Sequence, residues 1–482
     1  MNRKMILKIL GILLLCEAGL MILPVTVDLY YGEGIFTSFL TTIAILVVFG
    51  LAFARVKPDS KTIYSRDGFV IVALGWILLS LFGALPFFLS GEIPNYLDAL
   101  FESVSGFTTT GASILTDVES MSHANIFWRS FSHWIGGMGV LVFMMAVLPL
   151  AGGGGNLHLM RAESTGPDVG KLVPKSISTA RILYGIYFVM TIIEIILLII
   201  GGMPFFDSVT LSFGTAGTGG FAIKNDSIAG YSTYLQGVIT VFMALFGVNF
   251  NIYYLILCGK IKDALKSEEL RAYFAIMVIA IMIISFDIRG LFSTAFDSVH
   301  AAAFQVSSVM TTTGYATADF NKWPQLSKMV MLIVMCIGSC AGSTAGGIKV
   351  SRILLMLKNA RRELKRLLHP RNVSVIKFDG KRISDEVVQG TNVFLCLYVV
   401  ILALSVLVVS FDNLDFESNF TGVIATLNNI GPGLGYVGPT GNFSVYGWLS
   451  KCVFIIDMLF GRLEIFPMLL LFSRKPKSRK SA

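Results

Sequence analysis

The sequence predicts an all-α membrane protein with ten transmembrane helices, and three observations lead to this fold class. The 482-residue chain is 54% hydrophobic and only 14% charged, too little polar surface for a soluble protein of this size. Its apolar residues fall in long, nearly uncharged runs. Short segments rich in Gly and Thr recur between these runs at intervals of about a hundred residues.

The long apolar runs are the candidates for membrane-spanning helices. Most approach or exceed the roughly 20 apolar residues that a helix needs to cross a bilayer. The first run follows Asn2-Arg3-Lys4, as in a signal peptide, but it lacks a clear small-x-small cleavage site, so we expect a retained helix. The clearest runs are residues 5–23, 36–53, 69–89, 182–200, 237–258, 272–286 and 393–409.

The charged residues have an alternating layout along the chain. Two apolar spans separate each basic cluster from the next, and acidic residues gather in the other connections. The positive-inside rule therefore places both termini in the cytoplasm and gives ten spans. The net charge of +8 is mainly a topology signal, so we expect no nucleic-acid partner. The run 352–382 contains ten Lys or Arg, which suits membrane lipid headgroups or a docking protein.

Motifs for catalysis or for a resident metal do not occur in the sequence. The six Cys and five His are dispersed, and no CxxC pair is present. The glycine-rich stretches Gly152–Gly155 and Gly342–Lys349 lack the Gly-Lys-Ser/Thr of a phosphate-binding loop. We therefore expect neither an enzyme nor an organic cofactor on this chain.

The recurring segments share a motif. Phe101–Ser113 (FESVSGFTTTGAS) and Phe304–Thr317 (FQVSSVMTTTGYAT) match at F-x-x-x-S-x-x-T-T-T-G without a gap. Leu211–Phe221 keeps a Thr-Gly step, and Leu427–Gly435 keeps a glycine without the threonines. Aligning Gly111, Gly219, Gly314 and Gly431 gives spacings of 108, 95 and 117 residues. This period predicts one unit of span, short helix, loop and span, duplicated fourfold.

These units divide the chain into five parts. An N-terminal helix pair precedes four pseudo-repeated helix–pore loop–helix units, which we expect to surround one pore. The third unit is expected to have a broken last helix, and the fourth ends in a basic tail. The parts are residues 1–60, 61–160, 161–265, 266–370 and 371–482.

Thr and Gly in these loops suit a filter for cations. Rings of backbone carbonyls replace the hydration shell of an ion, and glycine permits the backbone angles that such rings need. Threonine adds a hydroxyl acceptor. Non-helical backbone at membrane depth is tolerated where protein buries it or water reaches it. The candidate ion ligands are Thr109, Thr110, Gly111, Gly217, Thr218, Gly219, Thr312, Thr313, Gly314, Asn429, Ile430 and Gly431.

At these residues the sequence resembles the TrkH/KtrB branch of the superfamily of potassium transporters. Further matching motifs are MRAESTGP (residues 160–167), SCAGSTAGGIK (339–349) and GRLEIFP (461–467). The match covers essentially the whole chain, and the N-terminal helix pair with MRAES makes it similar to TrkH. The second loop departs from the pattern, because Gly217 beside Thr218 would loosen this quarter of the filter.

The resemblance implies a function and partners that composition and spacing do not reveal. It implies potassium uptake across a bacterial inner membrane, with the potassium ion both transported and bound in the filter. It also implies a homodimer and a cytosolic regulatory subunit of the TrkA type that binds NAD or ATP.

The stretch Gly338–Gly347 lies within the last span of the third unit and predicts a broken helix. Glycine costs roughly 1 kcal/mol against alanine in a helix interior, and four glycines occur here with two Ser and one Thr. The alternative is close helix packing of the GxxxG kind. The resemblance implies an intramembrane gating loop at this place, with candidate residues Gly338, Gly342, Ser343, Gly346, Gly347 and Lys349.

Arg462 lies inside the last apolar run. A charge there costs at least ~2.5 kcal/mol unless it is paired or faces water. We expect it in the water-filled cavity under the filter, where a positive charge would raise the barrier for a cation. The family that the chain resembles carries an arginine at the matching place. The alternative is a structural ion pair, with Asp457 or Glu194 as the partner.

Two functions remain in competition at this point. One is a channel-like pore for potassium uptake, and the other is a secondary transporter that couples potassium to protons or sodium. A coupled carrier usually needs a titratable group at the membrane midplane. The filter loops contain no Asp, Glu or His, which favours channel-like flux.

Overall fold

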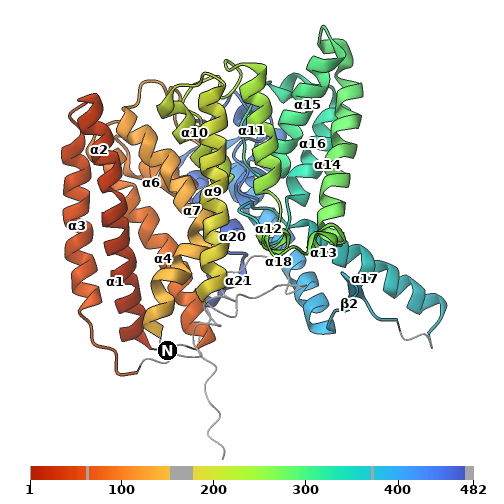
Figure 1. Ribbon diagram of the computed structural model, residues 1–482, viewed down its shortest axis with the longest axis horizontal. Coiled ribbons are helices and arrows are strands. Elements are labelled where there is room, and N and C mark those ends of the chain that lie inside the picture. Colours follow the sequence, from red (N-terminus) through yellow and green to blue (C-terminus); the bar gives the residue numbers. More distant parts are fainter. Residues whose placement is uncertain (1, 61–63, 152–176, 371–373, 473–482) are drawn as a thin grey trace, which may run out of the picture.

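The protein is a bundle of helices that stand side by side (Figure 1). It is a computed structural model that describes residues 2–60, 64–151, 177–370 and 374–472. In these ranges six helices are long and apolar enough to cross a membrane, or seven if one bent pair counts as a single span. The chain is therefore a helical multi-pass membrane protein, as the sequence predicted, and the count of ten spans stays a prediction.

The N-terminal helices form one edge of the bundle (Figure 1). They are α1 (Arg3–Leu20), α2 (Ile22–Tyr31) and α3 (Phe36–Ala54). Small residues let α1 and α3 approach closely, since a Cβ on Gly11 would lie 2.4 Å from the backbone nitrogen of Ala54. The carboxylate of Asp28 accepts hydrogen bonds from two backbone N–H groups at the start of α3, which stabilises the turn between the two spans.

Four short helices lie between longer helices in the rest of the described chain. A long helix is followed by a helix of 12, 13, 16 or 12 residues that ends at a predicted filter segment. A further helix then follows. The four short helices are α6 (Tyr96–Phe107), α10 (Phe205–Gly217), α15 (Ala295–Met310) and α19 (Phe416–Leu427).

The longer helices flank these four. Before them come α4 (Ser65–Gly83) with α5 (Leu85–Leu89), α9 (Ile177–Ile200), α13 (Ile261–Leu265) with α14 (Glu268–Asp287), and α18 (Asp385–Val409). After them come α7 (His123–Ala151), α11 (Thr233–Phe246) with α12 (Phe250–Leu257), α16 (Gln325–Ile337) with α17 (Val350–Leu368), and α20 (Trp448–Arg462) with α21 (Phe466–Phe472).

Short elements complete the described part of the chain. A two-residue hairpin pairs β1 (Lys377–Phe378) with β2 (Lys381–Arg382) in antiparallel register, with Lys377 opposite Arg382. Single 3₁₀ turns lie in the connections. They are η1 (Arg289–Leu291), η2 (Phe320–Lys322), η3 (Ser410–Asp412), η4 (Gly435–Val437) and η5 (Phe443–Val445).

Three of the helices that follow the short helices are interrupted. The α11 and α12 axes differ by 89°. Residues 338–349 separate α16 from α17, and this interruption contains the glycine-rich stretch Gly338–Gly347. Between α20 and α21, Glu464 and Ile465 have φ of 58° and 63°. Irregular backbone of this kind at membrane depth requires burial in protein or contact with water.

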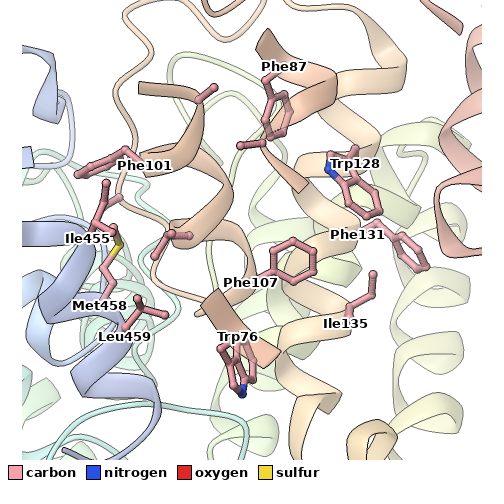
Figure 2. Close-up of a cluster of buried hydrophobic side chains, with 14 of the residues drawn as sticks. Trp76, Phe87, Phe101, Phe107, Trp128, Phe131, Ile135, Ile455, Met458 and Leu459 are labelled. Carbon is pink, nitrogen blue, oxygen red and sulfur yellow. The ribbon is translucent and has the colours of Figure 1, made fainter. Parts of the chain in front are cut away.

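A large apolar core surrounds the first short helix. Figure 2 shows Phe101 and Phe107 of α6 between side chains of α7 and α20. Trp128 of α7 donates its indole N–H to the carbonyl of Gly83 over 3.0 Å, which satisfies the polar end of a buried aromatic side chain. This packing fixes α6, and therefore the position of the segment that follows it.

Candidate functional site

The four short helices end in the same hydrogen-bonded cap. One residue past each helix adopts the left-handed conformation; it is the first residue past α10 and the second past α6, α15 and α19. The N–H of the residue that follows it donates to the carbonyl of the residue five positions earlier in the chain. These N–H to O distances are 2.8–2.9 Å, as in a Schellman cap. The left-handed residues are Thr109, Thr218, Thr312 and Asn429, with φ of 54°, 53°, 56° and 55°. Left-handed geometry costs roughly 1–2 kcal/mol for residues other than glycine, so tertiary contacts must hold it.

A glycine with positive φ follows two residues after each left-handed residue. These glycines are Gly111, Gly220, Gly314 and Gly431, with φ of 76°, 75°, 87° and 95°. The predicted register of the second segment is therefore wrong by one residue. Gly220 takes the place assigned to Gly219, Gly219 matches Thr110, and Gly217 is the last residue of α10. The spacing Thr-x-Gly, common to the first three segments, was the sequence signal for this register.

The four segments contact one another in a closed ring. A Cβ on Gly111 would lie 1.9 Å from the carbonyl oxygen of Gly219, and one on Gly220 would lie 1.7 Å from that of Thr313. A Cβ on Gly314 would lie 2.3 Å from the carbonyl oxygen of Ile430, and one on Gly431 would lie 2.8 Å from that of Thr110. Segment one thus meets two, two meets three, three meets four, and four meets one. The backbone packing leaves no room for side chains at these glycines.

This ring presents neutral oxygens and the negative ends of four helix dipoles. The four carbonyls lie at the contacts between segments, and the short helices end beside them. A helix C-terminus carries roughly half a negative charge. Within the described ranges no group of three or more His, Cys, Asp or Glu side chains gathers as a metal site. Such a ring can coordinate a cation weakly enough to release it.

Thr108 and Thr311 contact the predicted ligands Thr110 and Thr313 but were missing from the prediction. The Oγ1 atoms of Thr108 and Thr110 lie 2.8 Å apart, and those of Thr311 and Thr313 are also 2.8 Å apart. Thr108 also donates to the carbonyl of Val104 over 2.6 Å. The TTT triplets in the sequence were the signal for this pairing, which fixes hydroxyl orientation in two of the four segments.

A cavity of about 210 Å³ opens at one end of the ring, and all four positive-φ glycines contribute to its lining. Two basic residues, Arg129 and Lys224, line it as well. The guanidinium of Arg129 pairs with Glu102 and lies over the ring of Phe221, 3.7 Å from its centroid. Lys224 lies 4.4 Å from the centroid of the Tyr231 ring. The lining is therefore polar, but its positive charges are engaged by neighbouring groups.

The interrupted segment 338–349 lies against the other side of the ring. The N–H of Gly346 donates to Oγ1 of Thr312 over 2.7 Å, and a Cβ on Gly346 would lie 2.3 Å from the carbonyl oxygen of Asn428. Ser339 donates to the carbonyl of Met310 at the end of α15 over 3.0 Å. The segment therefore touches the third and fourth filter segments directly.

The predicted gating residues lie along this segment. Gly338, Gly342 and Gly347 have φ of 72°, 72° and 80°, and Lys349 has φ of 84°. The hydroxyl of Ser343 donates to the carbonyl of Cys340 over 2.7 Å, and the ammonium of Lys349 donates to the carbonyl of Ala345. Positive φ at these residues interrupts the helical path, and the segment folds back so that the N–H of Lys349 donates to the carbonyl of Ile337 over 3.0 Å.

Arg462 joins three parts of the site. It ends α20, is buried, and donates to the carbonyl oxygen of Thr344 over 2.7 Å and to that of Gly136 over 2.5 Å. It also donates to Oγ1 of Thr109 over 3.2 Å. The guanidinium thus bridges the interrupted segment, α7 and the first filter segment. Two residues further on, Glu464 forms an ion pair with Arg352 of α17 at 2.5 Å.

Comparisons with known proteins match nearly the whole chain to one family. The family model TrkH, described as a cation transport protein, matches residues 34–482. The Trk system potassium uptake protein TrkH of Salmonella typhimurium is 37% identical over 482 residues, which cover 98% of this chain and 99% of that protein. The Trk system potassium uptake protein TrkG of Escherichia coli is 34% identical over 460 residues, 94% of each chain.

A solved structure has the same architecture. The crystal structure of the potassium transporter TrkH from Vibrio parahaemolyticus superimposes with a TM-score of 0.88 and 34% identity. The match covers 98% of this chain and 99% of that one. These relatives are transporters and not enzymes, as the sequence predicted. The chain belongs to the TrkH family of cation transport proteins.

Proposed function

We propose that this chain takes up potassium across a bacterial inner membrane through a channel-like pore. The closed ring of four glycine-containing segments carries this proposal. Its ligands are neutral carbonyl and hydroxyl oxygens, which replace the hydration shell without trapping the ion. The relatives named as potassium uptake proteins support potassium as the transported ion.

In this proposal the chain has ten spans and four copies of one pore unit, with both termini in the cytoplasm. The helices before and after each short helix supply eight spans, and the N-terminal pair supplies two. The four repetitions of one element order support this arrangement. The basic clusters on alternate connections support the orientation.

In this proposal the segment 338–349 is the gate, and Arg462 holds it in the closed position. Gly346 and Arg462 hold the segment against the filter through hydrogen bonds to Thr312, Thr344 and Thr109. Removing these contacts would let the segment move away and clear the pathway. The positive charge of Arg462 would also oppose the passage of a cation while it stays in place.

We also propose a homodimer and a cytosolic nucleotide-binding regulatory subunit of the TrkA type. The relatives are named as members of a Trk system. The helix α17 extends out of the bundle (Figure 1) and exposes a leucine stripe next to basic residues, which suits contact with protein. The stripe comprises Leu357, Leu364, Leu367 and Leu368.

Liposomes that contain the purified protein test the transport proposal. Under opposed potassium and sodium gradients we expect an ohmic current that reverses near the potassium equilibrium potential. Rubidium should replace potassium with little loss, since the two ions have similar hydration. A fixed stoichiometry between potassium and protons or sodium would instead show a coupled carrier, and equal currents for potassium and sodium would contradict the proposed filter.

A further inference from the structure

A buried ion pair between α6 and α7 lies beside the ring, at the end that opens into the cavity. The Nε of Arg129 donates to Oε1 of Glu102, and the side chains are 3% and 0% exposed. A buried ion pair is costly unless hydrogen bonds satisfy its remaining groups. The remaining oxygens of Glu102 and the remaining N–H groups of Arg129 therefore need hydrogen-bond partners, and these lie on two filter segments.

Glu102 holds the chain that leaves the first filter segment. The hydroxyl of Ser113 donates to both carboxylate oxygens, at 3.0 and 3.1 Å. The backbone N–H of Ile114 donates to Oε2 over 3.1 Å. These two residues follow Gly111 by two and three positions, so the carboxylate fixes the backbone directly beyond the ring.

Arg129 holds the chain that leaves the second filter segment. Its Nη1 donates to the carbonyl of Ala222 over 3.0 Å, and its guanidinium lies over the ring of Phe221. These residues follow Gly220 by one and two positions. The pair therefore spans the contact between the first and second segments, where Gly111 meets the carbonyl of Gly219.

We propose that Glu102 and Arg129 are positioning residues for ion selectivity, which deepens the proposed transport function and rests on it. Through Ser113, Ile114 and Ala222 the pair sets the spacing of the first and second quarters of the ring. The size of an ion site and the field of its carbonyl dipoles govern how a filter separates potassium from sodium, and the spacing of the carbonyls enters both.

The other quarters are held in different ways. The residue nine positions before the filter glycine is Glu102 in the first unit, and Leu211, Gln305 and Gly422 in the others. Gln305 donates to the carbonyl of Ala318 in its own unit over 2.9 Å. The hydroxyl of Tyr315 donates to the carbonyl of Leu211 over 2.9 Å and so links the third unit to the second. Among the described residues, the Glu102–Arg129 ion pair contacts the segments of the first and second units.

The pair also controls the charge at the mouth of the ring. Arg129 lines the cavity into which the ring opens. Paired with Glu102, it contributes little net charge there. Without Glu102 a cation would approach an uncompensated guanidinium, and its rate of entry would fall.

Two substitutions separate geometry from charge. Glu102→Gln removes the negative charge and places in the first unit the residue that the third unit has. Arg129→Lys keeps the positive charge but loses the planar fork that reaches both Glu102 and Ala222. Asp98→Asn is the matched control, because Asp98 lies on the same helix α6 and pairs with Lys451 at 2.6 Å, away from the residues that follow the filter glycines.

The experiment measures reversal potentials of the full-length protein in liposomes, with thermal stability recorded for each variant. We expect Glu102→Gln to lower the potassium-to-sodium permeability ratio by about tenfold, equivalent to about 1.4 kcal/mol, and to lower flux at low potassium. Arg129→Lys should lower the ratio while flux at low potassium stays near that of the unaltered protein. Asp98→Asn should leave the ratio unchanged.

The outcomes are separable from those of the proposed function. If the unaltered protein shows no preference for potassium, the proposed function is wrong. If it is selective and a folded Glu102→Gln or Arg129→Lys protein keeps the same ratio, the positioning role is wrong. An equal loss of selectivity in Asp98→Asn would assign the effect to general loosening of α6, which also overturns the role.

Discussion

The side chain of Asn429 links the fourth filter segment to the first, because its Nδ2 donates to Oγ1 of Thr110 over 2.9 Å. The same amide donates to the carbonyl of Met458 on α20 over 2.9 Å. Asn429 stands where the other three segments have threonine, and asparagine tolerates the left-handed conformation better than threonine does. Asn429 thus adopts the left-handed backbone of the helix cap and also connects the fourth segment to the first.

Substitutions at Asn429 should separate these two contributions. Asn429→Gly keeps a left-handed backbone without strain but removes both hydrogen bonds, so we expect a folded protein with a lower potassium-to-sodium ratio. Asn429→Ala removes the bonds and adds strain of roughly 1 kcal/mol, so its thermal stability should fall further. Reversal potentials and thermal unfolding measure the two effects. Selectivity equal to that of the unaltered protein in Asn429→Gly would contradict the link to Thr110.

Gly220 tests the register of the second segment. A Cβ there would lie 1.7 Å from the backbone carbonyl oxygen of Thr313, at a φ of 75° that alanine rarely adopts. We expect Gly220→Ala to abolish potassium flux or to prevent folding. Gly237→Ala is the control in the same unit, since a Cβ at Gly237 meets nothing within 4 Å. Full flux in Gly220→Ala would show that Gly220 is not part of the ring.

The sequence was sufficient to predict a helical membrane protein and three of the four glycines at which the segments meet. Long apolar runs and a fourfold motif are local signals, and they predicted the membrane helices and the first, third and fourth filter glycines. The second register failed because Gly217, Gly219 and Gly220 allow several alignments, and the left-handed residue is decided by hydrogen bonds at the end of α10. The Glu102–Arg129 clamp joins residues 27 positions apart on two helices, so no local pattern reveals it.

The contact between Gly346 and the filter gives a test of the gate. A Cβ at Gly346 would press against the carbonyl oxygen of Asn428, at 2.3 Å, and push the segment away from the ring. We expect Gly346→Ala to raise potassium flux in the absence of any partner subunit. Gly390→Ala, on α18, is a control with open space around the added methyl group. Flux no higher than in the unaltered protein, with folding intact, would argue against a gating role.

The exposed leucines of α17 predict a contact between two copies of the chain. Leu364 is 62% and Leu367 79% exposed, although both are large apolar side chains. Leu364→Asp with Leu367→Asp should convert a dimer in detergent to a monomer, as measured by light scattering. Glu363→Gln on the same helix changes a charge outside the leucine stripe and should leave the dimer intact. A variant that remains dimeric would place the interface elsewhere.

Arg462 combines a positive charge with three hydrogen bonds, and paired substitutions can tell which of them limits flux. Arg462→Gln removes the charge and most of the reach to Thr109, Thr344 and Gly136. Arg462→Lys keeps the charge but not the fork of donors. If charge sets the barrier, potassium flux should rise several-fold in Arg462→Gln and stay low in Arg462→Lys. If the hydrogen bonds hold the segment 338–349 closed, both variants should raise flux, because neither can bridge all three oxygens. Equal flux in all three proteins would remove Arg462 from the gate and leave the ion pair between Glu464, just past α20, and Arg352 of α17 as the next contact to test.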